Sequence, residues 1–174
     1  RPGFQFDDNP NSGYLTDTIM VATIDPVVKT AAVLSFPRDL WIDVANPRAP
    51  ERQRRINQSF GDGVRATGTI RGGVEELKAD LKLNFGIDID HYVILDFEGV
   101  ELLVDALGGV DVDVPPDLAV PLWYYSDDDI HAVWVEFPPG LNHLDGYHAV
   151  AFGRHREYDS DLKRVKRQQL VLQA

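Results

Sequence analysis

The sequence has no cysteine among its 174 residues. This absence excludes disulfides, thiolate metal sites and a cysteine nucleophile, although it does not identify the compartment. No apolar run has the length needed to span a bilayer, and no signal peptide is recognisable. Because the chain opens at Arg1-Pro-Gly and stops within a helical pattern at Ala174, we interpret it as an excised domain that lacks any native membrane anchor.

Several common site motifs are also missing. The five histidines are scattered without zinc-ligand spacing, no glycine-rich phosphate loop ending in Gly-Lys occurs, and no Ser-His-Asp arrangement can be recognised. The formal net charge of −11 argues against nucleic acid as a partner, because such binding needs a broad basic surface. A small basic pocket for a phosphorylated ligand remains compatible with this charge.

The composition is that of a folded protein, with 44% hydrophobic and 26% charged residues. The length fits a single domain over residues 1–174. Strand and helix patterns alternate irregularly, which favours an α/β fold with a mixed central β-sheet flanked by helices. The expected strands are 18–24, 30–36, 41–44, 91–97 and 110–114, and the expected helices are 70–85, 99–107, 146–152 and the segment from Ser160 onward. Residues 1–16 and 47–55 are expected to be loops, and the long segment 115–140 is assigned no strand or helix.

The last 21 residues concentrate positive charge in this acidic chain, with six Lys or Arg. Arg154 and Arg156 are two residues apart, so an extended backbone would place both on one face, where their planar guanidinium groups suit phosphate oxygens. In the following helix, Asp161, Arg164 and Gln168 form a polar stripe near the N-terminus, whose dipole favours an anion. A lone charge run is more often a solvated face with a few ion pairs.

Two further polar positions flank the first strands. Arg38-Asp39 follows the strand 30–36, at a sheet edge where binding groups are often presented, although Arg-Asp pairs are also common surface ion pairs. Asp17 precedes the strand 18–24, and its simplest role is that of a turn residue. A carboxylate beside phosphate-binding arginines would also suit Mg²⁺, which takes one or two carboxylates together with substrate phosphates.

These motifs together resemble the catalytic domain of the LytR-CpsA-Psr family of cell-envelope enzymes. The resemblance covers nearly the whole chain and follows the family's order. The matching segments are Thr16-Asp17-Thr18-Ile19-Met20, Leu34-Ser35-Phe36-Pro37-Arg38-Asp39, Arg55-Ile56-Asn57-Gln58-Ser59-Phe60, Val104-Asp105-Ala106-Leu107-Gly108-Gly109-Val110 and the tail from Arg154-x-Arg156 through Asp161-x-x-Arg164-x-x-Arg167-Gln168-Gln169.

The resemblance implies a phosphotransferase that moves a glycopolymer from a polyprenyl-pyrophosphate carrier to peptidoglycan outside the cytoplasm, in a protein anchored to the plasma membrane. It implies Mg²⁺, or Mn²⁺ in its place, as cofactor, with Asp17 as a ligand. The residues that it implies for the pyrophosphate are Arg38, Arg154, Arg156, Arg164 and Gln168, with Arg38, Asp39, Arg154 and Arg156 as the catalytic group. Phosphoryl transfer needs charge neutralisation and alignment more than covalent help, which several arginines and one divalent cation supply.

A polyprenyl tail implies an apolar tunnel within the core. Its expected lining is Leu77, Leu81, Phe85, Val93 and Leu95, whereas an ordinary core would be close-packed. In the terminal helix, Leu162, Val165 and Leu172 are expected to face the core.

Two positions depart from the family's pattern. Leu15 stands where many members have an arginine, and a second metal-site carboxylate of the family lies upstream of this chain, so that Asp7 or Asp8 is the available substitute.

Other functions remain open at this point. A hydrolase that cleaves the lipid pyrophosphate would need the same site, with water as the acceptor. A non-catalytic module that binds envelope lipid or glycan belongs to a different class and would show no metal-dependent turnover. A nucleic-acid-binding regulator fits the acidic balance least.

Overall fold

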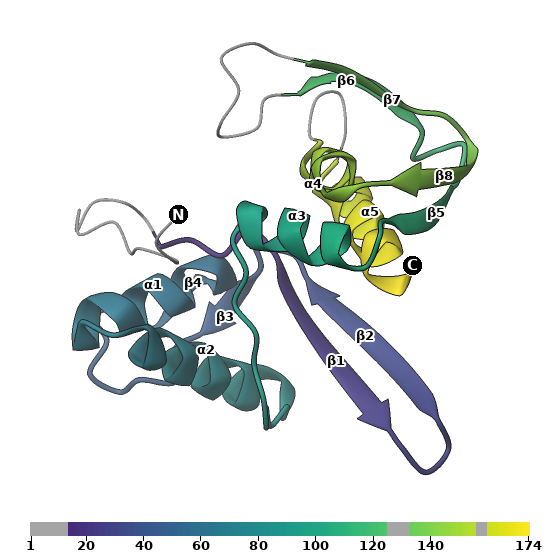
Figure 1. The fold of residues 1–174 in the computed structure, drawn as a ribbon. Helices are drawn as coiled ribbons and strands as arrows, with labels where there is room; N and C mark the ends of the chain where they lie inside the picture. Colours follow the sequence, from purple (N-terminus) through teal and green to yellow (C-terminus); the bar gives the residue numbers. More distant parts are fainter. Residues whose placement is uncertain (1–13, 125–132, 156–159) are drawn as a thin grey trace. The chain divides into compact units, whose positions relative to one another are not determined.

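The structure is a computed structural model that describes residues 14–124, 133–155 and 160–174. The chain forms two compact units, the N-terminal unit Arg1–Tyr92 and the C-terminal unit Val93–Ala174. In Figure 1 the N-terminal unit carries the elements from β1 to α2, and the C-terminal unit carries those from α3 to α5. The elements are β1 (Ile19–Asp25), β2 (Thr30–Phe36), β3 (Trp41–Asp43), β4 (Gln53–Arg55), α1 (Ile56–Thr67), α2 (Ile70–Phe85), α3 (Phe97–Ala106), β5 (Val110–Val114), β6 (Val120–Tyr124), β7 (Val133–Phe137), β8 (Gly140–Leu144), α4 (Gly146–Arg154) and α5 (Asp161–Gln173).

Three elements have the bounds expected from their residue patterns: β2, α2 and β5. Helix α2 begins after Thr69, whose side chain accepts a hydrogen bond from the Gly72 N–H, and ends at Gly86, which adopts the left-handed conformation with φ of 69°. Strand β5 alternates buried valines with exposed aspartates, as a half-buried strand should.

The α/β class is confirmed, with helices and strands in both units. The described strands pair as four two-stranded antiparallel sheets, β1–β2, β3–β4, β5–β8 and β6–β7, which differs from a single mixed sheet. Strand β1 pairs with β2 from Ile19 opposite Phe36 to Asp25 opposite Thr30, because a short turn joins two strands of equal length.

Helices α1 and α2 pack against each other in the N-terminal unit. Their backbones approach so closely that a Cβ at Gly63 would lie 2.3 Å from the Gly72 carbonyl oxygen. Beside them, a cluster of Ile19, Phe36, Ile42, Ile56 and Leu81 forms the apolar core of the unit.

Helix α1 is absent from the sequence expectation, and β4 lies within the segment expected to be a loop. Glycines at positions 61 and 63 weaken the helical signal, because glycine has low helix propensity. The spacing of Ile56, Phe60 and Val64, four residues apart, is the pattern that indicates this helix, and all three side chains are buried.

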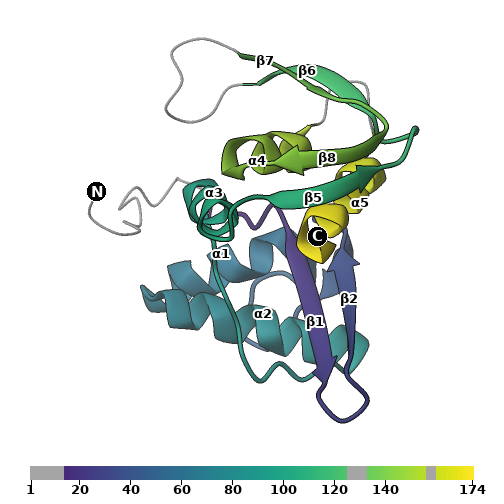
Figure 2. The ribbon, with the colours of Figure 1, turned by 45° about the vertical axis from the view of Figure 1, so that its right-hand side comes forward.

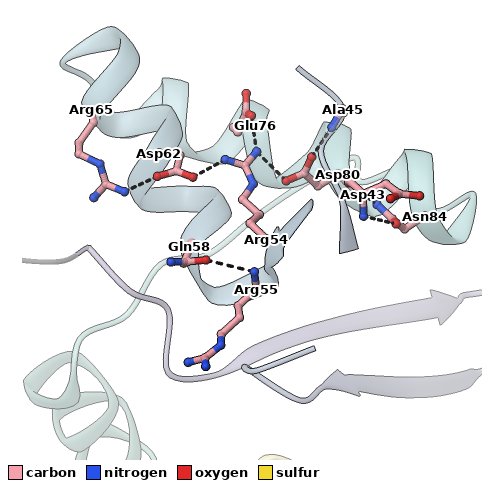
Figure 3. Close-up of polar contacts among 10 residues, drawn as sticks. All are labelled: Asp43, Ala45, Arg54, Arg55, Gln58, Asp62, Arg65, Glu76, Asp80 and Asn84. Atoms are coloured by element: carbon pink, nitrogen blue, oxygen red, sulfur yellow. Dashed lines mark hydrogen bonds and ion pairs between the residues drawn. The ribbon is translucent and has the colours of Figure 1, made fainter. Parts of the chain in front are cut away.

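The N-terminal unit also buries a charged network between α1, α2 and β4 (Figure 3). Arg54, with 3% of its side chain exposed, pairs with Asp62 at 2.5 Å, with Glu76 and with the fully buried Asp80 at 3.0 Å. Burial by itself would lower the pKa of Arg54, but the three carboxylates raise it above its usual value. This network links both helices to the strand that precedes α1.

In the C-terminal unit, the apolar core lies where β5 and β8 meet α4 (Figure 2). Val112, Phe137 and Phe152 are at most 1% exposed. The rings of Phe137 and Phe152 lie 5.0 Å apart, which places β7 against α4.

The strand expected over residues 91–97 is wrong, because this segment has no regular structure before α3 begins at Phe97. Asp96 caps the helix by accepting a hydrogen bond from the Gly99 N–H at 2.7 Å, so α3 begins two residues earlier than expected. The apolar run is therefore a connecting segment, in which Val93 is 80% exposed and Leu95 is 49% exposed.

Residues 115–140, for which the residue pattern predicts no strand or helix, contain the antiparallel pair β6–β7. The strand alternation there is hidden by prolines and by consecutive aromatic residues. None of the helices in the described part of the chain is sufficiently long and apolar to cross a membrane.

Candidate functional site

Asp17, Arg38, Asp39 and Arg55 form a charged cluster in the N-terminal unit. The Arg38 guanidinium pairs with Asp17, and its Nε lies 3.8 Å from Asp39 Oδ2. Asp39 also pairs with Arg55 at 3.3 Å. The Arg38 side chain is 19% exposed, whereas those of Asp17, Asp39 and Arg55 are about half exposed, at 47%, 49% and 52%. The cluster therefore holds a partly buried guanidinium, Arg38, and an exposed one, Arg55, beside carboxylates that pair with them.

The first residues of α1 bring these side chains together. The Ile56 N–H donates to the Leu40 carbonyl at 2.8 Å, and the Asn57 N–H donates to the Arg38 carbonyl at 3.2 Å. The Asn57 carbonyl in turn accepts from the Thr16 N–H at 3.1 Å. The segments that carry Asp17 and Arg38 are thus fixed to the same helical turn, which explains how residues 21 positions apart form an ion pair.

Arg55 was not among the expected site residues. Its neighbour Arg54 points into the buried network while Arg55 points toward solvent, because successive residues of a strand face opposite ways (Figure 3). The signal that could have identified Arg55 is its place at the start of the segment Arg55-Ile56-Asn57-Gln58-Ser59-Phe60.

Arg154 belongs to the C-terminal unit, where it is the last residue of α4 rather than part of an extended segment. Its guanidinium donates to the Tyr124 hydroxyl at 3.3 Å and lies 4.0 Å from the centre of the Phe97 ring. A cation over an aromatic face is oriented by the ring's negative face. His155 leaves the helix with extended geometry and is buried, whereas Arg156 lies outside the described residues.

Gln168 and Arg164 lie on the inward side of α5. The Gln168 amide donates to the Gly153 carbonyl at 3.2 Å, beside Arg154. Arg164 is 4% exposed and pairs with Asp161 at 2.7 Å. Arg164 and Gln168, from the polar stripe of the terminal helix, therefore face the interior of their unit. Ser160 precedes the helix, but its side chain makes no capping hydrogen bond.

The expected apolar face of α5 is wrong for two of its three residues, whereas Val165 is partly buried. Leu162 is 64% exposed and Leu172 is 56% exposed, whereas Arg167 is fully buried. The Nε of Arg167 donates to the Leu118 carbonyl at 3.2 Å, and its Nη1 donates to the His155 carbonyl at 3.4 Å. These carbonyls satisfy a buried guanidinium, so the helix can turn its basic stripe inward. Arg167 acts as a structural support that holds residue 155 against α5.

Asp145 caps the opposite end of α4. It accepts hydrogen bonds from the His148 N–H at 2.9 Å and from the His148 ring at 2.6 Å. Partial burial would raise the pKa of Asp145, but these hydrogen bonds and the charges of His148 and His143 lower it below the usual 3.8. The cap fixes the start of the helix that ends at Arg154.

The residues expected to line a lipid tunnel lie in different environments. Leu81 is buried in the N-terminal core and Leu77 packs against it. The Phe85 ring, which is 41% exposed, lies 4.9 Å from the ring of Phe36. Val93 and Leu95 belong to the exposed connecting segment rather than to a buried strand.

The expected metal ligand, Asp17, is present at the surface of the cluster. Within residues 14–124, 133–155 and 160–174, no group of three or more His, Asp or Glu side chains is arranged to hold a metal ion. Asp7 and Asp8, the alternatives for a second carboxylate, lie outside the described residues. A single carboxylate is compatible with Mg²⁺ only where a substrate's phosphates complete the coordination.

Comparisons with known proteins identify relatives along most of the chain. A polyisoprenyl-teichoic acid–peptidoglycan teichoic acid transferase, TagV of Bacillus subtilis (strain 168), is 33% identical over 161 residues, which are 91% of this chain and 37% of that protein. The regulatory protein MsrR of Staphylococcus aureus (strain COL) is 29% identical over 91% of this chain and 42% of its own length. The chain spans less than half the length of these relatives.

Solved structures agree with this likeness. The crystal structure of B. subtilis TagV matches with a TM-score of 0.71 and 31% identity, over 91% of this chain and 54% of that one. A structure of TagT bound to LIIa-WTA matches with a TM-score of 0.67 and 25% identity, over 92% and 56% of the two chains. The model of the LytR_cpsA_psr family matches residues 7–174, so the chain belongs to this family.

Proposed function

We propose that the protein is a phosphotransferase that moves a glycopolymer from a polyprenyl-pyrophosphate carrier to peptidoglycan. The observation that carries this proposal is the presence, in a chain of net charge −11, of a positioned guanidinium group in each unit, Arg38 and Arg154. The names of the relatives, teichoic acid transferases that act on peptidoglycan, support the same reaction class. The acidic balance makes a nucleic-acid regulator a poor alternative.

Within this proposal, Arg38, Arg154, Arg156, Arg164 and Gln168 bind the pyrophosphate oxygens. Guanidinium forks match pairs of phosphate oxygens and stay charged at any physiological pH. The Phe97 ring and the Tyr124 hydroxyl keep the Arg154 fork in one orientation, which lowers the entropic cost of engaging the anion. Charge neutralisation of this kind stabilises the transferring phosphoryl group.

Asp39 is proposed to orient the arginines of its cluster. Its carboxylate lies between Arg38 and Arg55, 3.8 Å and 3.3 Å from their nitrogens. A carboxylate in that position fixes two flexible side chains at once, so its removal would loosen both.

The lipid tail is proposed to lie along apolar side chains that include Leu77, Leu81, Phe85, Val93 and Leu95. The exposed fractions of Phe85, Val93 and Leu95, between 41% and 80%, favour contact with an apolar ligand over a role in a closed core. We further propose that the whole protein works outside the cytoplasm and is anchored in the membrane by a segment beyond residues 1–174.

Mg²⁺ is the proposed cofactor, with Asp17 as its ligand from the described residues and the donor's phosphates as the others. The ion would supply additional neutralisation of phosphate charge. Because Asp17 also pairs with Arg38, replacement by Asn should disturb both metal affinity and the position of Arg38.

The experiment supplies a lipid-linked glycopolymer donor to the protein with and without purified peptidoglycan, and follows the released lipid and the glycan attached to peptidoglycan. Transfer that requires peptidoglycan and falls at least 100-fold with a chelator is the expected result. Equal lipid release without peptidoglycan would favour a pyrophosphate hydrolase, and no turnover with any donor or metal would favour a binding module. Asp17→Asn should raise the Mg²⁺ concentration for half-maximal rate, and Mn²⁺ should substitute for Mg²⁺.

A further inference from the structure

The hairpin β6–β7 presents two tryptophans side by side on its outer face. Trp123 and Trp134 are directly opposite in the register, with ring centres 5.1 Å apart and planes at 64°. Their exposed fractions are 59% and 46%. The opposite face of the hairpin is inward, since Tyr124, Val135 and Phe137 are buried.

Polar atoms lie within reach of this aromatic pair. The Trp134 indole N–H donates to Glu136 at 2.8 Å, and Glu136 is opposite Pro121 in the same sheet. Pro121, Trp123, Trp134 and Glu136 therefore form one outward surface, which we name the tryptophan platform. Two exposed tryptophans in contact leave a large apolar area in water, a cost that a binding surface recovers when a ligand covers it.

The charge of the two strands limits which classes of ligand can bind the platform. Strands β6 and β7 contain one carboxylate, Glu136, and no Lys or Arg. Arg154 contacts the hairpin at Tyr124, on its inward face. An anionic membrane surface or a phosphate-rich polymer would be repelled by Glu136 and would find no basic side chain on these two strands, although binding to either needs basic side chains. A neutral sugar chain avoids that repulsion, and its hydroxyl groups can donate hydrogen bonds to carboxylates such as Glu136.

We propose that the tryptophan platform binds the neutral N-acetylhexosamine glycan strand of peptidoglycan. The C–H bonds on one face of a pyranose ring carry partial positive charge and match the negative faces of indole rings. Two adjacent indoles can contact neighbouring sugar rings of a strand, and Glu136 can accept from a hydroxyl at their edge. This inference rests on the proposed function, in which peptidoglycan is the acceptor.

The binding test uses insoluble peptidoglycan from which anionic polymers have been removed, and a soluble tetramer of β-1,4-linked N-acetylglucosamine. The double variant Trp123→Ala/Trp134→Ala should bind both at least tenfold more weakly than the unchanged protein. Trp123→Phe/Trp134→Phe should retain most of the affinity, because phenyl rings keep an aromatic face. Leu141→Ala is the matched control, since it removes another side chain that is 76% exposed, and its binding should be unchanged.

The kinetic test separates the platform from the donor site. The double alanine variant should raise the KM for peptidoglycan at least tenfold, while the KM for the lipid-linked donor and any release of lipid to water stay within twofold. Binding to peptidoglycan can be measured even if the protein transfers nothing, so this inference and the proposed function can fail separately.

Three results would overturn the inference. The first is wild-type affinity of the folded double alanine variant for both glycans. The second is a raised KM for the donor with an unchanged KM for peptidoglycan, which would place the donor's glycan on the platform. The third is binding of the unchanged protein to phosphatidylglycerol vesicles that is lost in the double variant. Circular dichroism and thermal unfolding of each variant establish that the fold is retained.

Discussion

The two units differ in the groups that surround their buried and partly buried arginines. In the N-terminal unit, Arg54 is surrounded by three carboxylates from α1 and α2. In the C-terminal unit, Arg167 is satisfied by the carbonyls of Leu118 and His155, and Arg154 is oriented by a phenol and an aromatic ring. The first arrangement neutralises a charge within the core, whereas the second supports and orients guanidinium groups around the end of α4.

This contrast distinguishes arginines that hold the fold from arginines that present a charge. A guanidinium within a set of buried carboxylates cannot be removed without leaving those carboxylates uncompensated. A guanidinium packed over a ring keeps its charge and its planar fork. Arg54 therefore has a structural role and Arg154 has a proposed binding role, and separate experiments can test the two.

The largest effect on stability is expected for Arg54→Met. The substitution leaves the buried Asp80 and the partly buried Glu76 without their cation, which should lower the free energy of unfolding by about 3–5 kcal/mol. Urea denaturation measures this loss. The matched control is Arg52→Met, an exposed position two residues away that should change stability by less than about 0.5 kcal/mol. Equal stability of the two variants would show that the network is not structural.

An intermediate effect is expected for Arg154→Lys, on binding rather than on stability. Lysine keeps the charge but lacks the planar fork, so affinity for a short-chain polyprenyl pyrophosphate should fall by about 1.5–3 kcal/mol, roughly 10- to 150-fold. Isothermal titration calorimetry measures the affinity, and Lys166→Ala is the control at an exposed position of α5. Wild-type affinity in the lysine variant would remove Arg154 from the proposed site. Arg156→Lys tests the second arginine of the pair in the same assay.

The smallest effect is expected for Asp145→Ala at the N-cap of α4. Loss of the cap should cost about 0.5–1 kcal/mol at neutral pH, because the side chain is largely exposed. Since the folded-state pKa of Asp145 lies below 3.8, the charge-dependent part of this stability is complete above pH 3.8 and is lost as the pH falls through the folded-state pKa. Thermal unfolding from pH 7 to pH 2 should show the difference from the unchanged protein shrinking only at the acid end. Asp113→Ala, on the exposed face of β5, should show no such convergence.

The residue pattern correctly predicted those strands and helices that are marked by residues within the element or next to it. Strand β2 lies between a turn and Pro37, helix α2 has a cap at each end, and β5 alternates with period two. Each signal lies within the element or directly beside it, so no distant contact was needed to recognise it. The connecting segment 91–96 was mistaken for a strand because an apolar run has the same composition whether it is buried in a sheet or exposed.

The motifs predict which residues form the candidate site, but they do not predict which side chains and backbone groups hold those residues in place. The motifs indicated Asp17, Arg38, Asp39, Arg154, Arg164 and Gln168. The ion pair between Asp17 and Arg38, and the contact of Asp39 with Arg55, depend on backbone hydrogen bonds between segments about 40 and 20 residues apart in the chain. No spacing rule within one element predicts such pairs.

By itself, the sequence determined the family, the α/β class and the concentration of basic residues in the last helix. Tertiary structure alone decided which side of that helix is inward. Leu162 and Leu172 suggest an apolar buried face, yet Arg164 and Arg167 are the buried residues. The physical reason is that burial of a guanidinium depends on acceptors from elsewhere in the chain, here the carbonyls of Leu118 and His155, which lie 49 and 12 residues from Arg167.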